Sequence, residues 1–411
     1  MRRRSLLVAG VCALLGLTGA GVAMGASRPV QQAPASAPQL RLHRDVSGLR
    51  EPGAEPAGVL ESVSAGAIER TASRTFTYPG ADYVKVHFSR IALEAGDRVV
   101  VSDAGGSEQY EYTSKDLGDA DNWSMSVSGD RAVVRVRKAD DDVFGIRSRL
   151  ASLGVTVDKV ARGQTPAERA RSDADRRTAR AAAPREESIC GRTDETANAA
   201  CYKSSDPVAY ANSKPVARIL INGVELCTAW RVGTRNRMLT NHHCFTTTRE
   251  ARNTEVWFNY ECARCDGGTT LHPTKVMGDQ VLATDEILDY TLFSVRDFNQ
   301  IQQFGYLEID DRAPVRGEEL YIPQHPRGAP RVITMQDSTE HSGNCAVSNP
   351  SYHGYAANTD LSYYCDTDGG SSGSPVISRR TNKVIGLHHF GGCPNSGVRI
   401  DRIAAHLRGL A

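Results

Sequence analysis

All but one of the cysteines of this chain lie in its C-terminal part. Cys12 is the first of ten, and the other nine lie from Cys190 onward, with none between residues 27 and 189. In an exported protein, such clustering predicts a C-terminal domain that is crosslinked by disulfides. Because nine is odd, at least one thiol is expected to lack a partner within the chain.

Cys262 and Cys265 have the close spacing of one half of a zinc site. We find no second pair that would complete such a site. The sequence therefore predicts no metal and no cofactor.

The N-terminus has the three parts of a cleaved secretion signal. A basic start is followed by an apolar run from Leu6 to Leu17 and by small residues up to Ala26. The run is too short to span a bilayer, so we predict a signal peptide at 1–26 and a secreted, extracellular protein. A retained N-terminal anchor is the alternative. The formal net charge of +1 gives no reason to expect nucleic acid or stable membrane association.

Residues 27–187 fall into three segments of different composition. Residues 27–74 are rich in Pro, Ala, Ser and Gln, which predicts a flexible leader. Residues 75–160 contain strand-like runs separated by Gly and Asp turns, which predicts a small β-sandwich. Residues 161–187 contain many Arg and Ala residues and no aromatic residue, which predicts an exposed processing linker.

Residues 188–411 consist of many short strand-like runs and turns, and they end in one helical pattern. Ile400, Ile403, Leu407 and Leu410 fall at helical spacing. The pattern predicts an all-β domain with a C-terminal helix.

Three segments of this domain carry residues that peptide cleavage needs: an activated hydroxyl, a base and donors for an oxyanion. His243 ends an apolar run and precedes Cys244. Asp289 stands at the head of an apolar strand-like run. Ser372 lies in a glycine-rich loop that runs from Asp368 to Pro375.

These segments resemble the His, Asp and Ser motifs of the trypsin-like peptidase superfamily, in that family's chain order. They are most similar to bacterial secreted lysyl and glutamyl endopeptidases, and the resemblance covers residues 188–411. It implies a chymotrypsin-like double β-barrel and a secreted serine endopeptidase. The catalytic residues would be His243, Asp289 and Ser372, with the N–H groups of Gly370 and Ser372 as the oxyanion hole.

Each of the three catalytic residues has a neighbour of the same type. His242, Asp285 and the serines Ser371 and Ser374 are the alternatives. The family motif places the catalytic imidazole directly before the cysteine and the catalytic Asp directly before the strand. We therefore assign the roles to His243, Asp289 and Ser372.

Many animal trypsins have an Asp directly before the serine, and a newly cut N-terminus neutralises it on activation. Ser371 occupies that position here. The hypothesis is that residues 27–187 act as a propeptide that keeps the zymogen latent or assists its folding.

The resemblance leaves the preferred residue at the scissile bond open. Asp366 falls at the base of the primary pocket, and Gly391 and Gly397 fall where small residues leave that pocket open. A carboxylate there predicts cleavage after Arg, or after Arg and Lys. His388 matches a pocket histidine of glutamyl endopeptidases and favours cleavage after Glu as the alternative. The linker contains arginines but no lysine, which places cleavage after Lys alone third.

The resemblance also implies disulfides. The pairs are Cys227–Cys244, Cys190–Cys393, and Cys201 with either Cys262 or Cys265. Cys345–Cys365 is then left by elimination.

Two other classes of function stay open. The chain could be a catalytically silent, protease-like binding protein, or the sandwich could be a permanent surface-binding module. The expected partners are polypeptide substrates and the chain's own propeptide, and the expected state is a monomer.

Overall fold

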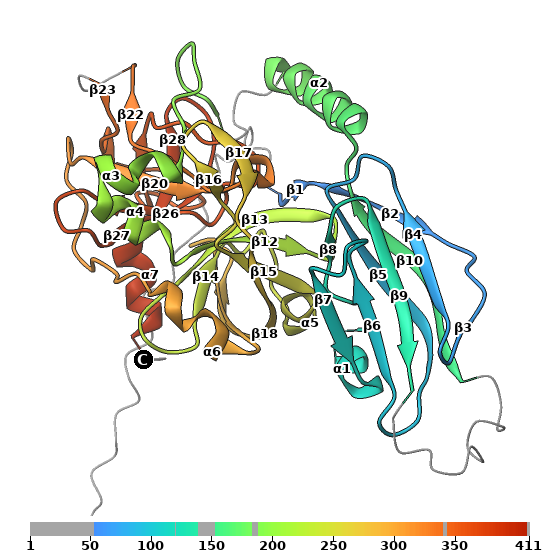
Figure 1. Ribbon diagram of the computed structural model, residues 1–411. Coiled ribbons are helices and arrows are strands. Elements are labelled where there is room, and N and C mark those ends of the chain that lie inside the picture. The colour runs from blue at the N-terminus through green and yellow to red at the C-terminus, as the bar shows by residue number, and fades with distance from the viewer. Residues whose placement is uncertain (1–52, 120, 139–152, 183–187, 340–342, 409–411) are drawn as a thin grey trace, which may run out of the picture. The chain divides into compact units, whose positions relative to one another are not determined.

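The structure is a computed structural model that describes residues 53–119, 121–138, 153–182, 188–339 and 343–408 (Figure 1). The predicted signal peptide and residues 27–52 of the predicted leader lie outside the described residues. Within the described ranges, no helix combines the length and apolar character needed to cross a membrane.

Two antiparallel sheets that share one core form the β-sandwich predicted for the N-terminal part. The first sheet has the order β2-β10-β5-β8, with β3 beside β10; its strands are β2 (Gly58–Ser62), β3 (Ile68–Glu69), β5 (Tyr83–Ala92), β8 (Val127–Ser128) and β10 (Gly154–Gly163). The second has the order β4-β9-β6-β7; its strands are β4 (Ser73–Thr77), β6 (Arg98–Ser102), β7 (Gln109–Tyr112) and β9 (Arg131–Arg137), and helix α1 (Ser114–Asp119) follows β7. In β9, Ala132, Val134 and Val136 are buried between exposed arginines, as in a strand with one face on a core.

The predicted flexible leader at 27–74 was wrong for its last twenty residues. These residues form β1 (Glu55–Pro56), β2, β3 and the start of β4. Ile68 of β3 is 2% exposed and belongs to the sandwich core, and β2 pairs with β10 along its whole length. Short apolar runs inside a Pro- and Ala-rich stretch were enough to form strands because β10 supplies a paired edge.

The predicted linker at 161–187 begins as strand and continues as helix. β10 extends to Gly163, and helix α2 spans Pro166–Ala182. Thr165 and Glu168 close the first turn of α2 with reciprocal hydrogen bonds, which form a capping box. Arg162 is buried, and its guanidinium contacts Glu168 at 2.7 Å. Residues 183–187 of the linker lie outside the described residues.

The first barrel of the C-terminal domain is a closed, six-stranded antiparallel sheet. It closes because β13 pairs with both β12 and β14. Its strands are β12 (Val216–Ile221), β13 (Glu225–Arg231), β14 (Met238–Thr240), β15 (Thr254–Phe258), β18 (Thr274–Asp285) and β19 (Tyr290–Val295). β14 pairs with β13 only at Trp230 and Arg231, and β1 pairs with Glu225 and Leu226 on the part of that edge that β14 leaves free.

An eight-stranded antiparallel sheet forms the second half of the domain, in the order β11-β21-β20-β26-β27-β28-β25-β24. Its strands are β11 (Ala197–Asn198), β20 (Leu320–Gln324), β21 (Val332–Thr334), β24 (Asn349–Tyr352), β25 (Asp360–Tyr363), β26 (Pro375–Ser378), β27 (Val384–Phe390) and β28 (Asn395–Arg399). The predicted C-terminal helix is α7 (Ile400–Leu407), which buries Ile400 and Ile403 in a core shared with both halves. The predicted all-β, trypsin-like double barrel is thereby confirmed.

Smaller elements connect these sheets. They are the paired strands β16 (Cys262–Arg264) and β17 (Gly267–Thr270), the pair β22 (Gln336–Asp337) and β23 (Gly343–Asn344), and the short helices α3 (Tyr202–Ser205), α4 (Pro207–Ser213), α5 (Thr248–Arg252) and α6 (Phe298–Ile301).

Four disulfides crosslink the C-terminal domain. They are Cys190–Cys393, Cys201–Cys265, Cys227–Cys244 and Cys345–Cys365. Cys265, not Cys262, is thus the partner of Cys201, and Cys262 is a buried thiol without a disulfide.

A buried charged cluster joins the sandwich to the first barrel. Lys85 of β5 lies 2.8 Å from the carboxylate of Glu255 in β15, and both side chains are about fully buried. Ser126 donates to the same carboxylate through its N–H at 2.8 Å and its hydroxyl at 2.6 Å. In return, Lys275 of β18 pairs with Glu108 of the sandwich.

The sandwich and the first barrel each supply one cation and one anion to this cluster. Burial alone would raise the pKa of Glu255, but Lys85 and Lys275 outweigh it and hold the pKa below its usual range. A buried ion pair of this kind depends on both partners, since one charge left alone is costly.

We therefore expect Lys85→Met to destabilise the chain by about 3–5 kcal/mol, because Glu255 would keep a buried charge without its nearest cation. The measurement is the midpoint of thermal or denaturant unfolding. Lys159→Met is the matched control, because Lys159 is exposed in β10 of the same sheet. Equal stability of the two variants would contradict the assigned role of the pair.

Candidate active site

Asp289 lies in the tight turn that joins β18 to β19. Its backbone φ is +40°, in the left-handed region that Asp adopts more readily than most residues. Asp285, the alternative candidate, accepts the N–H of Leu288 at 2.8 Å and so closes this turn. Asp289 itself is 1% exposed.

His243 follows β14 and faces Asp289 with two groups. Its Nδ1 lies 2.8 Å from Oδ2 of Asp289, and its backbone N–H donates to Oδ1 at 3.0 Å. Since Nδ1 carries the proton given to the carboxylate, Nε2 is the basic nitrogen. Nε2 is buried and has no hydrogen-bond partner within the described part of the chain. His242 instead contacts the hydroxyl of Thr284 at 2.9 Å.

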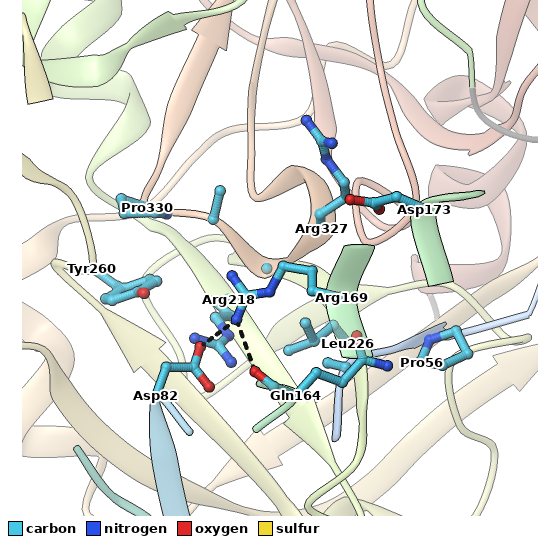
Figure 2. A pocket seen from close by; sticks show the side chains of 13 residues that line it. Pro56, Asp82, Gln164, Arg169, Asp173, Arg218, Leu226, Tyr260, Arg327 and Pro330 are labelled. Atoms are coloured by element: carbon cyan, nitrogen blue, oxygen red, sulfur yellow. Dashed lines mark hydrogen bonds and ion pairs between the residues drawn. The ribbon is translucent and has the colours of Figure 1, made fainter. Parts of the chain in front are cut away.

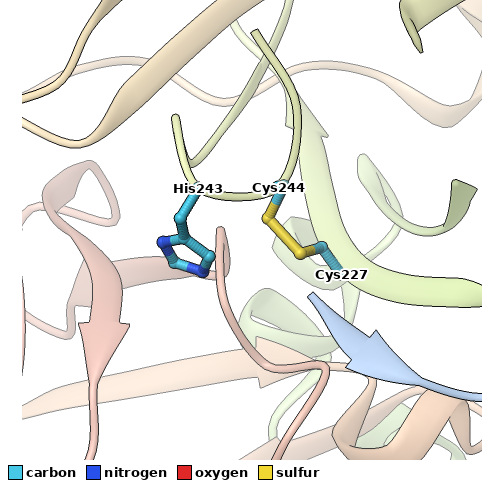
Figure 3. A group of neighbouring side chains, drawn as sticks. All are labelled: Cys227, His243 and Cys244. Carbon is cyan, nitrogen blue, oxygen red and sulfur yellow. A yellow bond between two sulfur atoms is a disulfide. The ribbon is translucent and has the colours of Figure 1, made fainter. Parts of the chain in front are cut away.

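The residue after His243 is fixed by a disulfide. Figure 3 shows Cys244 bonded to Cys227 of β13, directly beside the His243 ring. The three side chains offer ligand atoms within 4.8 Å of one another, but both sulfurs are used in the disulfide and are not thiolates. The bond therefore holds the histidine loop against β13 and does not supply a metal site.

A second histidine, which the sequence analysis did not single out, contacts Asp289. Nδ1 of His389 lies 3.0 Å from Oδ2 of Asp289, and its Nε2 lies 2.6 Å from Oδ2 of Asp360. All three side chains are buried. A ring with a carboxylate on each nitrogen needs an N–H on each, so His389 is held as an imidazolium.

Neighbouring charges determine the ionisation states of His389 and Asp289. Burial alone would lower the pKa of His389, but Asp360 and Asp289 outweigh it and raise the pKa to about 9. Burial alone would raise the pKa of Asp289, but His243 and His389 outweigh it and hold the pKa well below its usual range. Asp289 is thus an anion that orients His243 at any pH near neutrality.

The serine loop is tied to both barrels. The N–H of Thr228 in β13 donates to the carbonyl of Ser372 at 2.8 Å, and the N–H of Gly373 donates to the carbonyl of His388 at 2.9 Å. Gly373 has φ +88°, and a Cβ there would collide with the carbonyl of Thr228. Gly370 has φ +92°, which likewise favours glycine. Ser372 is 2% exposed.

The predicted pocket residues fall into two groups. His388 of β27 and Gly397 of β28 are paired directly across the sheet, and Gly391 follows the end of β27. Nδ1 of His388 lies 2.7 Å from the hydroxyl of Tyr363 in β25. Burial, with the charge of His389 second, lowers the pKa of His388 to about 3, so its ring is neutral.

Asp366, predicted as the base of the pocket, is used elsewhere. One carboxylate oxygen accepts the N–H of Cys190 and the other the N–H of Glu195, both at 2.7 Å. The side chain is 1% exposed, and burial raises its pKa to about 6. Asp366 therefore anchors the N-terminal segment of the domain. The sequence placed it by motif spacing, which carries no information on these backbone donors.

Comparison with known proteins places this domain in a family. Residues 227–387, which include His243, Asp289 and Ser372, match the model of the trypsin-like peptidase domain. This part of the chain is a trypsin-like peptidase domain of the trypsin-like serine peptidase superfamily.

The individual relatives either have low sequence identity to this chain or match it over only part of their length. The secreted RxLR effector protein 73 of Plasmopara viticola is 35% identical over 54% of this chain, and the match spans 56% of that protein's length. Solved structures of Rv3671c protease and of a Glu endopeptidase share 16% and 17% identity and cover 51% and 54% of this chain. They are covered to 95% and 98% of their own length, with TM-scores of 0.37 and 0.38.

The imidazolium at His389 predicts how stability depends on pH. Its pKa rises from an ordinary 6.5 to about 9 on folding, so its contribution is complete below pH 6.5 and is lost as pH rises through about 9. Asp360→Asn removes one of its two anions and should diminish that loss, which is on the order of 3 kcal/mol in the unchanged protein. Melting temperatures from pH 6 to 10 test this.

Asp266→Asn, an exposed carboxylate, serves as the control and should keep the full pH dependence. If Asp360→Asn showed the same alkaline loss as this control, His389 would not be the titrating group.

Proposed function

We propose that the chain is a secreted serine endopeptidase in which Ser372 is the nucleophile, His243 the general base and Asp289 the group that orients the imidazole. The observation that carries the proposal is the pair of hydrogen bonds from His243 to Asp289. They fix the tautomer that leaves Nε2 of His243 basic.

The reaction follows from these roles. His243 takes the hydroxyl proton of Ser372 as its oxygen attacks the peptide carbonyl, and later protonates the leaving amine. The N–H groups of Gly370 and Ser372 would stabilise the oxyanion, a contribution of about 10²–10³ in turnover for each donor. Water then releases the acyl group by the same steps in reverse order.

For specificity we propose a pocket based on His388 and Tyr363, with Asp366 outside it. Both oxygens of Asp366 already accept backbone N–H bonds, and the side chain is 1% exposed, so little of the carboxylate is accessible to an arginine. The hydroxyl of Tyr363 and the neutral ring of His388 form a polar pair without a carboxylate. This arrangement favours an acidic residue before the scissile bond over Arg or Lys.

Residues 27–187 are proposed to act as the propeptide, and the linker around α2 as the processing segment. The support is the Arg-rich composition of the linker and the buried contacts between Lys85, Ser126 and Glu255. Secretion rests on the signal-like N-terminus and on the four disulfides.

Cleavage of a peptide library tests nucleophile and specificity together. We expect cuts after Glu or Asp, and a loss of about 10⁴-fold or more in kcat/KM in Ser372→Ala. Ser374→Ala is the matched control, because its hydroxyl lies in the same loop and has no hydrogen-bond partner among the described residues. It should cleave at the unchanged rate.

Asp366→Asn separates the two specificities. Cuts after Arg that disappear in this variant would make Asp366 the base of the pocket and overturn the proposed His388 pocket. No cleavage by the unchanged protein would favour the silent binding-protein alternative.

A further inference from the structure

We propose that residues 54–58 of this chain occupy the leaving-group side of its own substrate cleft and so block extended substrates, an inference that rests on the proposed peptidase function. The blocking segment, residues 54–58, contains β1 and the two residues that follow it. It is held there because it continues directly into β2 of the sandwich.

The segment binds as an added strand. Glu55 lies opposite Leu226 and Pro56 opposite Glu225, in antiparallel register at the free edge of β13. The N–H groups of Ala57 and Gly58 both donate to the carbonyl of Val224, at 2.8 and 3.0 Å. Main-chain pairing at an open sheet edge is a common way to bind an extended peptide.

The register points the segment at the reactive residues. Moving from Pro56 to Glu55 along the segment corresponds to moving from Glu225 to Leu226 and on toward Cys227 and Thr228. Thr228 is the residue whose N–H holds the carbonyl of Ser372.

Ala54 completes this approach. It packs against the core of the first barrel, and that core includes the Cys227–Cys244 disulfide. In Figure 3 the blue strand of this N-terminal region begins beside Cys227. The proposed pocket pair, His388 and Tyr363, belongs to the second sheet, whereas β13 belongs to the first barrel. We therefore infer that the leaving-group side of the cleft lies at β13.

Glu55 closes the gap between β13 and the serine loop. Its carboxylate lies so close to Gly369 that a Cβ at that glycine would collide with it. Gly369 directly precedes Gly370, a proposed oxyanion donor. The blocking segment therefore spans from the edge of β13 to the oxyanion loop, across the position that the residues after a scissile bond would take.

The sandwich keeps the segment in place. The hydroxyl of Tyr83 donates to the carbonyl of Gly223 at 2.8 Å, in the turn between β12 and β13. A Cβ on Gly58 would collide with that hydroxyl, so the end of the blocking segment lies close against Tyr83 of the sandwich. The Lys85–Glu255 pair fixes the same sheet to β15.

The opposite side of the segment is hollow. A cavity of about 240 Å³ is lined by Pro56, Leu226 and Arg327 and by Arg169 and Asp173 of α2. Figure 2 shows these side chains. The blocking segment is thus fixed at β13 and bordered by α2, the helix of the proposed processing linker. Cleavage in α2 and release of the sandwich would remove the blocking segment and leave this part of the β13 edge unpaired.

The experiment compares two substrates with the same residues before the scissile bond. One is a short chromogenic anilide, and the other is a fluorogenic peptide extended by several residues beyond the bond. We measure the ratio of their kcat/KM values on the intact chain, whose length is checked by mass spectrometry before and after the assay. The ratio cancels differences in the fraction of active protein.

Ala54→Asp puts a charge into the apolar contact with the disulfide cluster and should release the segment. We expect the ratio of extended peptide to anilide to rise about tenfold, the equivalent of about 1.4 kcal/mol of lost binding. Glu55→Ala, which removes the carboxylate beside Gly369, should raise the ratio in the same direction if Ala54→Asp fails to fold. Leu60→Asp, at a side chain that is 53% exposed in β2, should leave it unchanged.

An unchanged ratio in both Ala54→Asp and Glu55→Ala, with the anilide still cleaved, would overturn the inference and leave the peptidase proposal intact. Anilide cleavage that is absent from every chain, or that persists in Ser372→Ala, would instead overturn the proposed function.

Discussion

The carboxylate of Asp289 is the group on which the arrangement of the site depends. It is buried and accepts N–H groups from two histidines: His243, the proposed base, and His389, which another carboxylate holds as a cation. A buried carboxylate is stable as an anion only when such donors replace water. The first barrel supplies Asp289 and His243, whereas His389 and Asp360 come from the second sheet. The contact between the halves is therefore also what orients the proposed base.

Three features of the surrounding structure hold the site residues in place. The turn before β19 holds Asp289 at positive φ, the Cys227–Cys244 disulfide fixes the histidine loop, and the serine loop is bonded to both barrels through Thr228 and His388. Strand β13 takes part in the last two contacts and also pairs with β1. The edge of β13 at which we propose that a substrate binds is thus the edge that pairs with the N-terminal part of the chain.

Sequence reasoning succeeded where a residue type occurs in a recognisable local pattern. His243, Asp289 and Ser372 were singled out in this way, and the structure brings His243 and Asp289 into hydrogen-bond contact. The two-part architecture and the final helix were also predicted from local patterns. It failed where the partner is distant in the chain. His389 and Asp360 meet only because β25 and β27 both pair with β28, and no local pattern marks either residue. The partners of Asp366 are backbone N–H groups far away in sequence, which no local pattern reveals. Strands β1 to β3 were missed because their stability comes from β10 and β13.

The central claim is that Asp289 is held between two histidines of different charge. Nitrogen NMR of protein labelled in its histidine rings tests it directly, with the signals of His389 identified from their absence in His389→Gln. The account predicts that both nitrogens of His389 carry protons at pH 7 and that the ring loses one only near pH 9. A His389 ring that is neutral at pH 7, with one protonated nitrogen, would contradict it.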